Sequence, residues 1–456
     1  MSDQDRHRSE TADLLHGPLL GPIVFFAVPL AVSSMLQQLF NAADTAVVGR
    51  FAGSQAMAAV GSNSPIINLI VSLFVGCSVG ANVVISTLIG QGRKNEISEA
   101  VHTAITFALA SGIFLIAVGL LAAVPLLRLV GTPEDVQDYA ALYLRIFFCG
   151  MPFLMLYNFG SAVLRSKGES KKPVYALICG GVLNVCLNLI FVIVFHLHVI
   201  GVALATVISN GVSSCLVLRC LVRETGPFHV DLRRLHVKRE HLLRMIQIGF
   251  PAGLQGIVFS LSNTVVQSGI NSFGSLASAG SAAALNFEII AYYAVNAFNQ
   301  AAVTFTSQNF AAGKYDRCRK IYRICMLCAL ASTGCIDFGV ILGRNVLLRI
   351  FTTDPQVIAF ATVRLTHILA FQWMVCSYEV TGSTMRGMGY SMTPAMLTVL
   401  GTCVLRIFWV LVIFPMYRSL EVLYSVYPVS WVVTGSLVLG AYFMIRRKVF
   451  RSEGEV

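Results

Sequence analysis

The chain has 456 residues, of which 56% are hydrophobic and only 12% are charged. Soluble domains carry about 25% charged residues, so this composition excludes an ordinary soluble fold. The net charge of +11 could suggest a nucleic-acid partner, but the basic residues gather between long apolar stretches. That pattern is typical of a membrane protein, and we expect the lipid bilayer as a partner and no nucleic acid.

Twelve apolar stretches follow one another, each long enough to cross a bilayer as a helix. In chain order they cover residues 21–48, 56–89, 100–127, 136–164, 174–195, 199–221, 245–271, 280–308, 321–343, 357–385, 394–417 and 423–445. The sequence therefore predicts an all-α membrane protein with twelve transmembrane helices.

Lys and Arg are distributed unequally between the two sides of the predicted membrane. The even-numbered connections and the C-terminal tail hold Arg93, Lys94, Arg165, Lys167, Lys171, Lys172, Arg233, Arg234, Lys238, Arg239, Lys314, Arg317, Arg319, Lys320, Arg446, Arg447, Lys448 and Arg451. The odd-numbered connections hold little more than Arg50, Arg128, Arg344, Arg349 and Arg418. This bias predicts that both termini lie in the cytoplasm. The polar first residues do not resemble a cleavable signal peptide.

The second half of the chain repeats the first. A shift of 221 residues places Arg165 on Arg386, Gly168 on Gly389 and Pro173 on Pro394, and a shift of 222 places Pro29 on Pro251 and Asn41 on Asn263. We interpret this as a duplicated six-helix unit. The expected organisation is a cytoplasmic segment 1–20, a first lobe 21–221, a cytoplasmic linker 222–244, a second lobe 245–446 and a cytoplasmic tail 447–456.

Parallel repeats of this kind are typical of secondary transporters, in which two pseudo-symmetric lobes open a central cavity to alternate sides. A channel is the competing interpretation, but no short pore loop with a repeated filter motif occurs. The chain has no G-x-x-x-x-G-K-[ST] motif either, so we expect an ion gradient to drive transport, with no cofactor and no enzymatic activity. The twelve cysteines show no metal-ligand spacing, and none lies in an external connection.

Asp44 is an acid near the end of the first apolar stretch. It shares one helix face with Gln37 and Asn41, because the three are spaced at i, i+4 and i+7. A polar stripe in a membrane span is expected to face protein or water, so Gln37 and Asn41 are also candidates for lining a substrate cavity. Pro29 gives the same helix a place to bend. The other interpretation is that Asp44 is hydrated at the outer interface of the membrane.

Companions for Asp44 occur in the fifth and sixth stretches. Asn184 and Asn188 are one helical turn apart, and Thr206 lies in the next helix. Amide and hydroxyl oxygens beside a carboxylate suit a proton or a small hard cation such as Na⁺. Each of these residues could instead hold helices together by hydrogen bonding.

The second lobe carries different polar groups, and Val266 stands where the repeat would place Asp44. The candidates for lining a substrate cavity there are Asn263, Gln267, Glu288, Tyr292, Asn299, Glu379 and Arg406. The other interpretation is that Glu288 or Glu379 forms a structural ion pair with Arg406.

Several segments together make the chain similar to the MATE family, the multidrug and toxic compound extrusion transporters. They are "NAADTAVVGRFAG", "VVISTLIGQG", its counterpart "TFTSQNFAAG", "VLRSKGESKKP", "STMRGMGYSMTP" and "GVALATVIS". The resemblance implies twelve helices in two lobes and export of lipophilic, mostly cationic compounds against inflowing protons or sodium.

The resemblance also implies roles for single residues. Asp44 matches the family acid implicated in ion coupling, Pro29 matches the associated kink, and Asn184 and Thr206 match companions of that acid. Asn188 departs from several members that have aspartate at this position. Phe259 and Ser260 depart as well, because other members have a glutamate there.

We therefore expect a bacterial inner-membrane multidrug antiporter that works as a monomer, with protons favoured over sodium as the coupling ion. A flippase for a lipid-linked saccharide or cell-wall precursor is the alternative, since such proteins share the wider fold. A cavity for polyanionic cargo would be rich in Lys and Arg, and the mixed charges of the second lobe favour cationic cargo only weakly.

Overall fold

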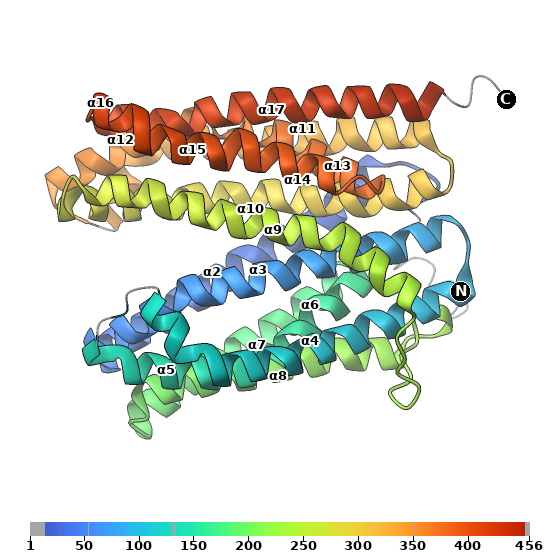
Figure 1. Cartoon of the computed structure of the whole chain (residues 1–456), viewed down its shortest axis with the longest axis horizontal. Helices are drawn as coiled ribbons and strands as arrows, with labels where there is room; N and C mark the ends of the chain where they lie inside the picture. Colours follow the sequence, from blue (N-terminus) through green and yellow to red (C-terminus); the bar gives the residue numbers. More distant parts are fainter. Residues whose placement is uncertain (1–13, 53, 130–131, 133, 351, 452–456) are drawn as a thin grey trace. The chain divides into compact units, whose positions relative to one another are not determined.

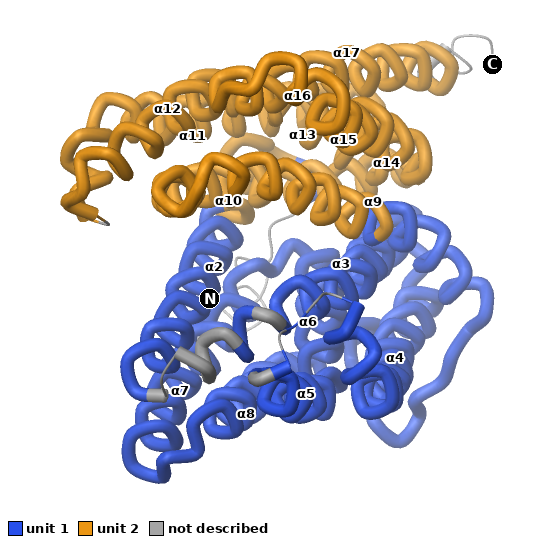
Figure 2. Tube along the Cα trace, turned by 60° about the vertical axis from the view of Figure 1, so that its left-hand side comes forward, with its two compact units in different colours: residues 1–16, 28–253 blue, residues 17–27, 254–456 orange. Residues whose placement is uncertain are grey.

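The computed structural model describes residues 14–52, 54–129, 132, 134–350 and 352–451. These residues form helices joined by short non-helical connections. Residues 1–13 of the expected N-terminal segment and 452–456 of the expected tail lie outside this range. Two compact units divide the chain (Figure 2). One contains Val28–Gly253, and the other contains Gly17–Ala27 and Leu254–Val456. The divisions fall inside two long helices, beside Pro29 and Pro251.

Each of the twelve predicted stretches corresponds to one helix or to a run of consecutive helices (Figure 1). The first half contains α2 (Leu20–Val47) with the π-turn η1 (Val48–Ala52), α3 (Ser54–Gly90), α4 (Lys94–Leu129), α5 (Glu134–Cys149), α6 (Met151–Ser166), α7 (Lys171–Leu189) with the π-turn η2 (Ile190–Val194), and α8 (His198–Arg223). The second contains α9 (Arg239–Asn271), α10 (Ser275–Ala311), α11 (Tyr315–Leu347) with η4 (Leu348–Ile350), α12 (Pro355–Gln372), α13 (Val375–Gly387), α14 (Met392–Thr398), η5 (Val399–Val404), α15 (Leu405–Phe408), η6 (Trp409–Ile413), α16 (Phe414–Met416) and α17 (Leu420–Arg451).

Nine helices in the described part of the chain are long and apolar enough to span a membrane, and eleven spans result when each of two bent pairs is taken as one. The remaining helix, α10, is less apolar because it is rich in Ala, Ser and Asn. It packs against α11, α12 and α13, so much of its surface is covered by protein. The all-α prediction of twelve spans in two lobes is confirmed.

The bent pairs occupy equivalent places in the two halves. α5 and α6 meet at an angle of 46°, and α12 and α13 meet at the same angle of 46°. Pro152 stands at the start of α6, where its missing amide hydrogen costs no helical hydrogen bond. The fourth span of each half is therefore broken in the same way, as a duplicated unit predicts.

The turns that end equivalent helices also repeat. Gly168 has φ of 93° and its counterpart Gly389 has φ of 91°, a region that disfavours residues with a Cβ. In both turns the amide after the glycine donates to a carbonyl five residues earlier, from Glu169 to Leu164 and from Tyr390 to Met385. These are Schellman caps, which satisfy the last carbonyls of a helix. The repeated glycines are thus explained by repeated helix ends.

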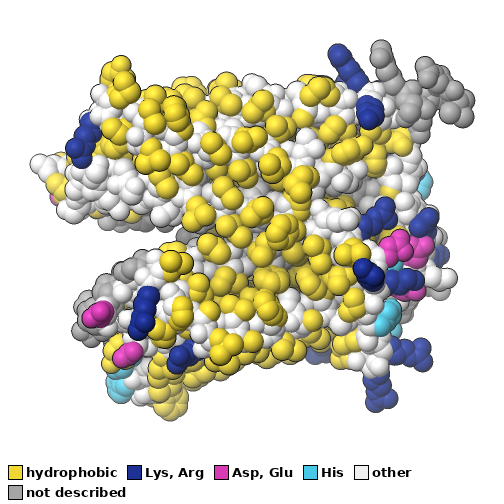
Figure 3. Space-filling view, viewed as in Figure 1, with side chains coloured by type: hydrophobic (Ala, Val, Ile, Leu, Met, Phe, Trp, Pro, Cys, Tyr) yellow, Lys and Arg dark blue, Asp and Glu magenta, His cyan; other side chains and the backbone are white. Residues whose placement is uncertain are grey.

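Hydrophobic side chains cover the middle of the helices on the face shown in Figure 3, while charged side chains gather near the helix ends. Inside the first unit a large apolar core includes Leu88, Leu115, Phe148 and Phe159. A smaller core in the second unit includes Leu365 and Leu369. The interiors of both units are thus mainly apolar, and the polar groups buried within them are exceptions.

Part of the basic linker packs against the first unit. Val230 is buried in its apolar core, and the Asp231 amide donates to His102 Nε2 over 3.1 Å. Farther along, the Lys238 amide donates to Thr103 Oγ1 over 3.0 Å, and Lys238 Nζ lies 2.7 Å from Glu99 Oε2. The linker between the two halves is therefore docked on α4 rather than fully solvated.

Candidate functional site

The first polar cluster is built around Asp44 near the end of α2. The Asn188 side-chain amide, on α7, donates to Asp44 Oδ1 and lies 3.3 Å from Asn184 Oδ1 one turn earlier. Asn188 is fully buried and Asn184 is buried, whereas Asp44 is half-buried. The structure therefore brings together the acid and both asparagines that the sequence selected, although their role in ion coupling stays a prediction.

Close packing of α7 on α8 positions the two asparagines. A Cβ at Gly180 would lie 1.9 Å from Ser213 Oγ, so only glycine permits this approach one turn before Asn184. Ser213 Oγ in turn donates to the Ala176 carbonyl over 3.1 Å. The small residue and the cross-helix hydrogen bond hold α7 in place against α8.

The other predicted companions of Asp44 are less closely involved. The Thr206 hydroxyl donates to the Val202 carbonyl of its own helix over 2.9 Å. Gln37 and Asn41 are exposed, and Pro29 lies within α2, which continues through it as an α-helix. The sequence missed Tyr143, a buried residue of α5 that interacts electrostatically with Asp44. Tyr143 was missed because helical spacing does not show which residues of different helices meet.

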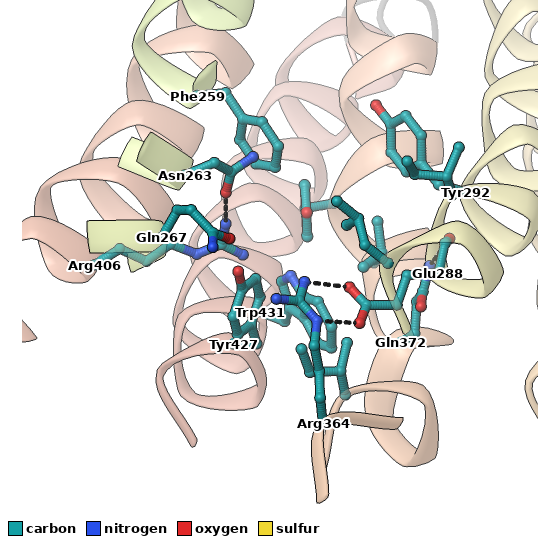
Figure 4. Close-up of a pocket in the computed structure, with 15 residues that line it drawn as sticks. Phe259, Asn263, Gln267, Glu288, Tyr292, Arg364, Gln372, Arg406, Tyr427 and Trp431 are labelled. Atoms are coloured by element: carbon teal, nitrogen blue, oxygen red, sulfur yellow. Dashed lines mark hydrogen bonds and ion pairs between the residues drawn. The ribbon is translucent and has the colours of Figure 1, made fainter. Parts of the chain in front are cut away.

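The second unit contains a cavity of about 250 Å³ (Figure 4). Of the residues selected from the sequence, Asn263, Gln267, Glu288, Tyr292 and Arg406 line it. Aromatic side chains supply much of the remaining wall, including Phe259, Tyr378, Tyr427 and Trp431. Such a mixture of rings and a few polar groups is typical of small-molecule sites.

Glu288 on α10 pairs with Arg364 on α12 across this cavity (Figure 4). Gln372 Nε2 also donates to the Glu288 backbone carbonyl over 2.8 Å. The proposed pair of Glu288 with Arg406 is wrong, because Arg364 occupies both oxygens of that carboxylate. Arg364 was not among the residues selected from the sequence; it lies in the middle of α12, where its side chain is buried.

Arg406 contacts neutral groups instead. Its Nη1 donates to Asn263 Oδ1 over 2.8 Å and its Nε to Ser430 Oγ over 3.2 Å. The guanidinium carbon lies 4.4 Å from the centre of the Tyr427 ring and 5.2 Å from that of Phe259. With a relative exposure of 1%, it is a buried cation held by amide, hydroxyl and π-electron density.

Two further acids of the second unit lie away from the cavity wall. Glu379 accepts a hydrogen bond of 3.0 Å from Asn299 Nδ2 and interacts electrostatically with Arg386, so its expected pairing with Arg406 is wrong as well. Asp337 on α11 is fully buried, and neither carboxylate oxygen has a hydrogen-bond partner among the described residues. The sequence analysis overlooked Asp337, although an acid inside an apolar span is itself a signal.

The model of the MatE family matches the chain twice, over residues 29–190 and 251–412. Together the two matches cover most of the chain and coincide with its two halves. The chain belongs to the MatE family. The family is one of multidrug efflux transporters, so this MatE chain is a multi-pass transmembrane transporter of that family, which points away from an enzyme.

Relatives of similar length support this assignment. The probable multidrug resistance protein YoeA of Bacillus subtilis is 28% identical over 93% of this chain and 93% of its own. YpnP of the same organism, also a probable multidrug resistance protein, is 28% identical over 86% of this chain and 88% of its own. A solved MATE multidrug resistance transporter of the MOP superfamily, described as outward-facing, has a TM-score of 0.90 at 21% identity and covers 97% of this chain and 99% of that one. That likeness establishes the MatE fold.

Proposed function

We propose that this MatE-family chain is a secondary active antiporter that exports lipophilic, mostly cationic compounds in exchange for protons. Its two lobes would open alternately to the two sides of a bacterial inner membrane, with both termini in the cytoplasm and the monomer as the working unit. The coupling ion is a proton in this proposal, and sodium is the competitor. The observation that carries the proposal is the environment of Asp44.

Asp44 has the properties that a coupling residue needs. It is the only acid of α2 and sits half-buried, within reach of the Asn188 amide. An amide donor stabilises the charged carboxylate, while burial among apolar residues favours the neutral acid. Two opposing influences of this kind let modest changes around the residue move the proton on or off. Reciprocal competition between proton and drug then follows from linkage.

Cationic cargo is supported by the same residue. A carboxylate that has released its proton attracts a cation, and taking up a proton removes the attraction. The lipophilic part of the cargo would be received by apolar and aromatic surface.

The test is the accumulation of a panel of fluorescent lipophilic cations, including ethidium, in bacteria that lack their own efflux pumps. Cells expressing the protein should accumulate less dye than vector cells, and a protonophore should abolish the difference. Equal accumulation at a verified membrane level of the protein, for every dye of the panel, would reject the proposed export of cations.

A further inference from the structure

Arg406 stands at the place in the second repeat where the first repeat has Asn184. The two family matches, residues 29–190 and 251–412, begin and end 222 residues apart, and this shift relates position 184 to position 406. Pro173 and Pro394 correspond at a shift of 221 residues, which is one residue less. The π-helical turn Val399–Val404 lies between Pro394 and Arg406 and accommodates the extra residue. The same register places Asn263 on Asn41 and Val266 on Asp44.

The two repeats therefore carry opposite charges in clusters built from corresponding helices, although not at corresponding residues. In the first unit, Asn184 and Asn188 of α7 face the carboxylate of α2. In the second unit, Arg406 of α15 faces the Asn263 amide of α9, and the aligned Val266 is fully buried and apolar. Duplication has thus produced one acidic cluster and one basic cluster from one ancestral arrangement.

The positive charge of Arg406 is not neutralised by protein. Glu288, the one acid among the residues that line the cavity, is engaged by Arg364. No carboxylate among the described residues lies within ion-pair distance of Arg406. A buried cation without a counter-charge is costly, and an anion that enters the cavity would lower that cost.

We propose that this cavity binds the anionic group of an aromatic carboxylate, with the carboxylate on Arg406 and the ring between aromatic walls. The inference rests on the proposed exporter function and assigns the carboxylate of an aromatic cargo to one residue, Arg406. Arg presents a planar fork that matches a carboxylate, and Phe259, Tyr427 and Trp431 offer ring faces and edges. At about 250 Å³ the cavity suits one or two fused rings rather than a large drug.

A cation would find no comparable partner in this cavity. Arg364 holds both oxygens of Glu288, at 2.6 and 2.8 Å, so a ligand ammonium would have to displace a buried bidentate pair. Arg364 Nη1 is also committed, because it donates to Ser281 Oγ over 2.6 Å. Arg406 also donates to Asn263 and Ser430, but both are neutral, so it is the charged group of the lining that has no carboxylate partner.

The test compares three probes that share one ring system: 2-naphthoate, 2-naphthamide and 2-naphthylmethylammonium. Binding to the purified full chain in a neutral detergent is measured by isothermal titration calorimetry, without any ion gradient. We expect naphthoate to bind at least about tenfold more tightly than either other probe. Arg406→Gln should remove that advantage, Arg406→Lys should keep part of it, and Arg446→Gln, which removes an arginine over Phe443 outside the cavity, should change nothing.

A second variant keeps the test decisive if Arg406→Gln does not fold. Asn263→Asp places a carboxylate against Arg406 with little change of volume, so it should also abolish the preference for naphthoate. The proposal is overturned if the ammonium probe binds as tightly as naphthoate, or if either variant binds naphthoate like the parent. Because binding is measured without transport, failure of proton-coupled export would leave this result unaffected, and the reverse also holds.

Discussion

Arg364 of α12 and Glu288 of α10 form a bidentate ion pair, with Nε 2.6 Å from one carboxylate oxygen and Nη2 2.8 Å from the other. Both side chains are buried, and the guanidinium also lies 5.6 Å from the Tyr424 ring centre. The pair joins two helices far apart in sequence and satisfies most of the polar atoms that it buries. Breaking one side would leave a buried charge without a partner, which is more costly than removing both.

Single neutralisation of this pair should therefore destabilise the protein. Glu288→Gln and Arg364→Gln should each lower the free energy of unfolding by about 3–5 kcal/mol, and the double variant should lose less than the sum. Thermal unfolding can be followed with a thiol-reactive coumarin maleimide, because Cys325, Cys376 and Cys403 are free and buried. Arg349→Gln, at the end of a helix, is the control. Additive losses would contradict the coupling of the two residues.

Asp337 should behave in the opposite way. Both of its carboxylate oxygens lack a hydrogen-bond partner in the described chain, and it interacts electrostatically with Glu288. Asp337→Asn removes an acid without breaking a hydrogen bond, so the free energy of unfolding should stay within about 1 kcal/mol of the parent value or rise. Glu288→Gln is the matched control, since it makes the same chemical change at a partnered acid. A loss as large as that of Glu288→Gln would show that Asp337 has an essential partner.

The sequence predicted correctly those features of the fold that a single local rule decides. Apolar length predicted each helical span, and the match of Gly168 with Gly389 predicted a repeat that the structure shows as two equivalent Schellman caps. Helical spacing also grouped Asn184 with Asn188 correctly.

The errors concern partners on different helices. Helical periodicity shows which residues share a face, but the angular position of α12 beside α10 depends on packing of the whole core. For that reason Arg364 was not recognised as the partner of Glu288, and Arg406 was assigned one it does not have. Asp337 was overlooked although it is an acid inside an apolar run, because no Asn or Gln lies one helical turn away from it to form a stripe like the one at Asp44.

Asp44→Asn should abolish export without affecting the amount of protein in the membrane. The substitution keeps the size of the side chain and its contact with Asn188 but removes the exchangeable proton. Cells expressing the variant should accumulate ethidium as vector cells do. Thr45→Ser changes the adjacent exposed residue and should export normally. Export by Asp44→Asn at the parent rate would mean that Asp44 is only a hydrated residue at the membrane interface.

The orientation can be tested with single cysteines in a cysteine-free background. Arg234→Cys in the linker and Arg447→Cys near the end of α17 replace exposed residues that the charge bias places inside. Both should be protected from an impermeant maleimide in intact cells and become labelled after permeabilisation. Arg418→Cys, exposed in the connection before α17, should be labelled in intact cells. The reverse pattern would invert the proposed topology.

The last prediction concerns the coupling ion, for which the Asp44 cluster offers few oxygen ligands. A sodium site needs several oxygens, yet the Asn188 side chain presents its amide nitrogen rather than its oxygen to Asp44. A proton needs only the carboxylate.

Proteoliposomes with an imposed pH gradient and no sodium should therefore transport ethidium, and Asp44→Asn proteoliposomes should not. Adding sodium at a fixed pH gradient should leave the rate unchanged within about twofold, because Na⁺ must lose its hydration shell to enter a site with one formal charge. Asn188→Asp supplies a second carboxylate beside Asp44 and is the matched variant for this comparison. If sodium coupling requires two acids, that variant alone should gain a dependence on sodium. Parent proteoliposomes that stay inactive until sodium is added, and then follow the sodium gradient, would refute proton coupling.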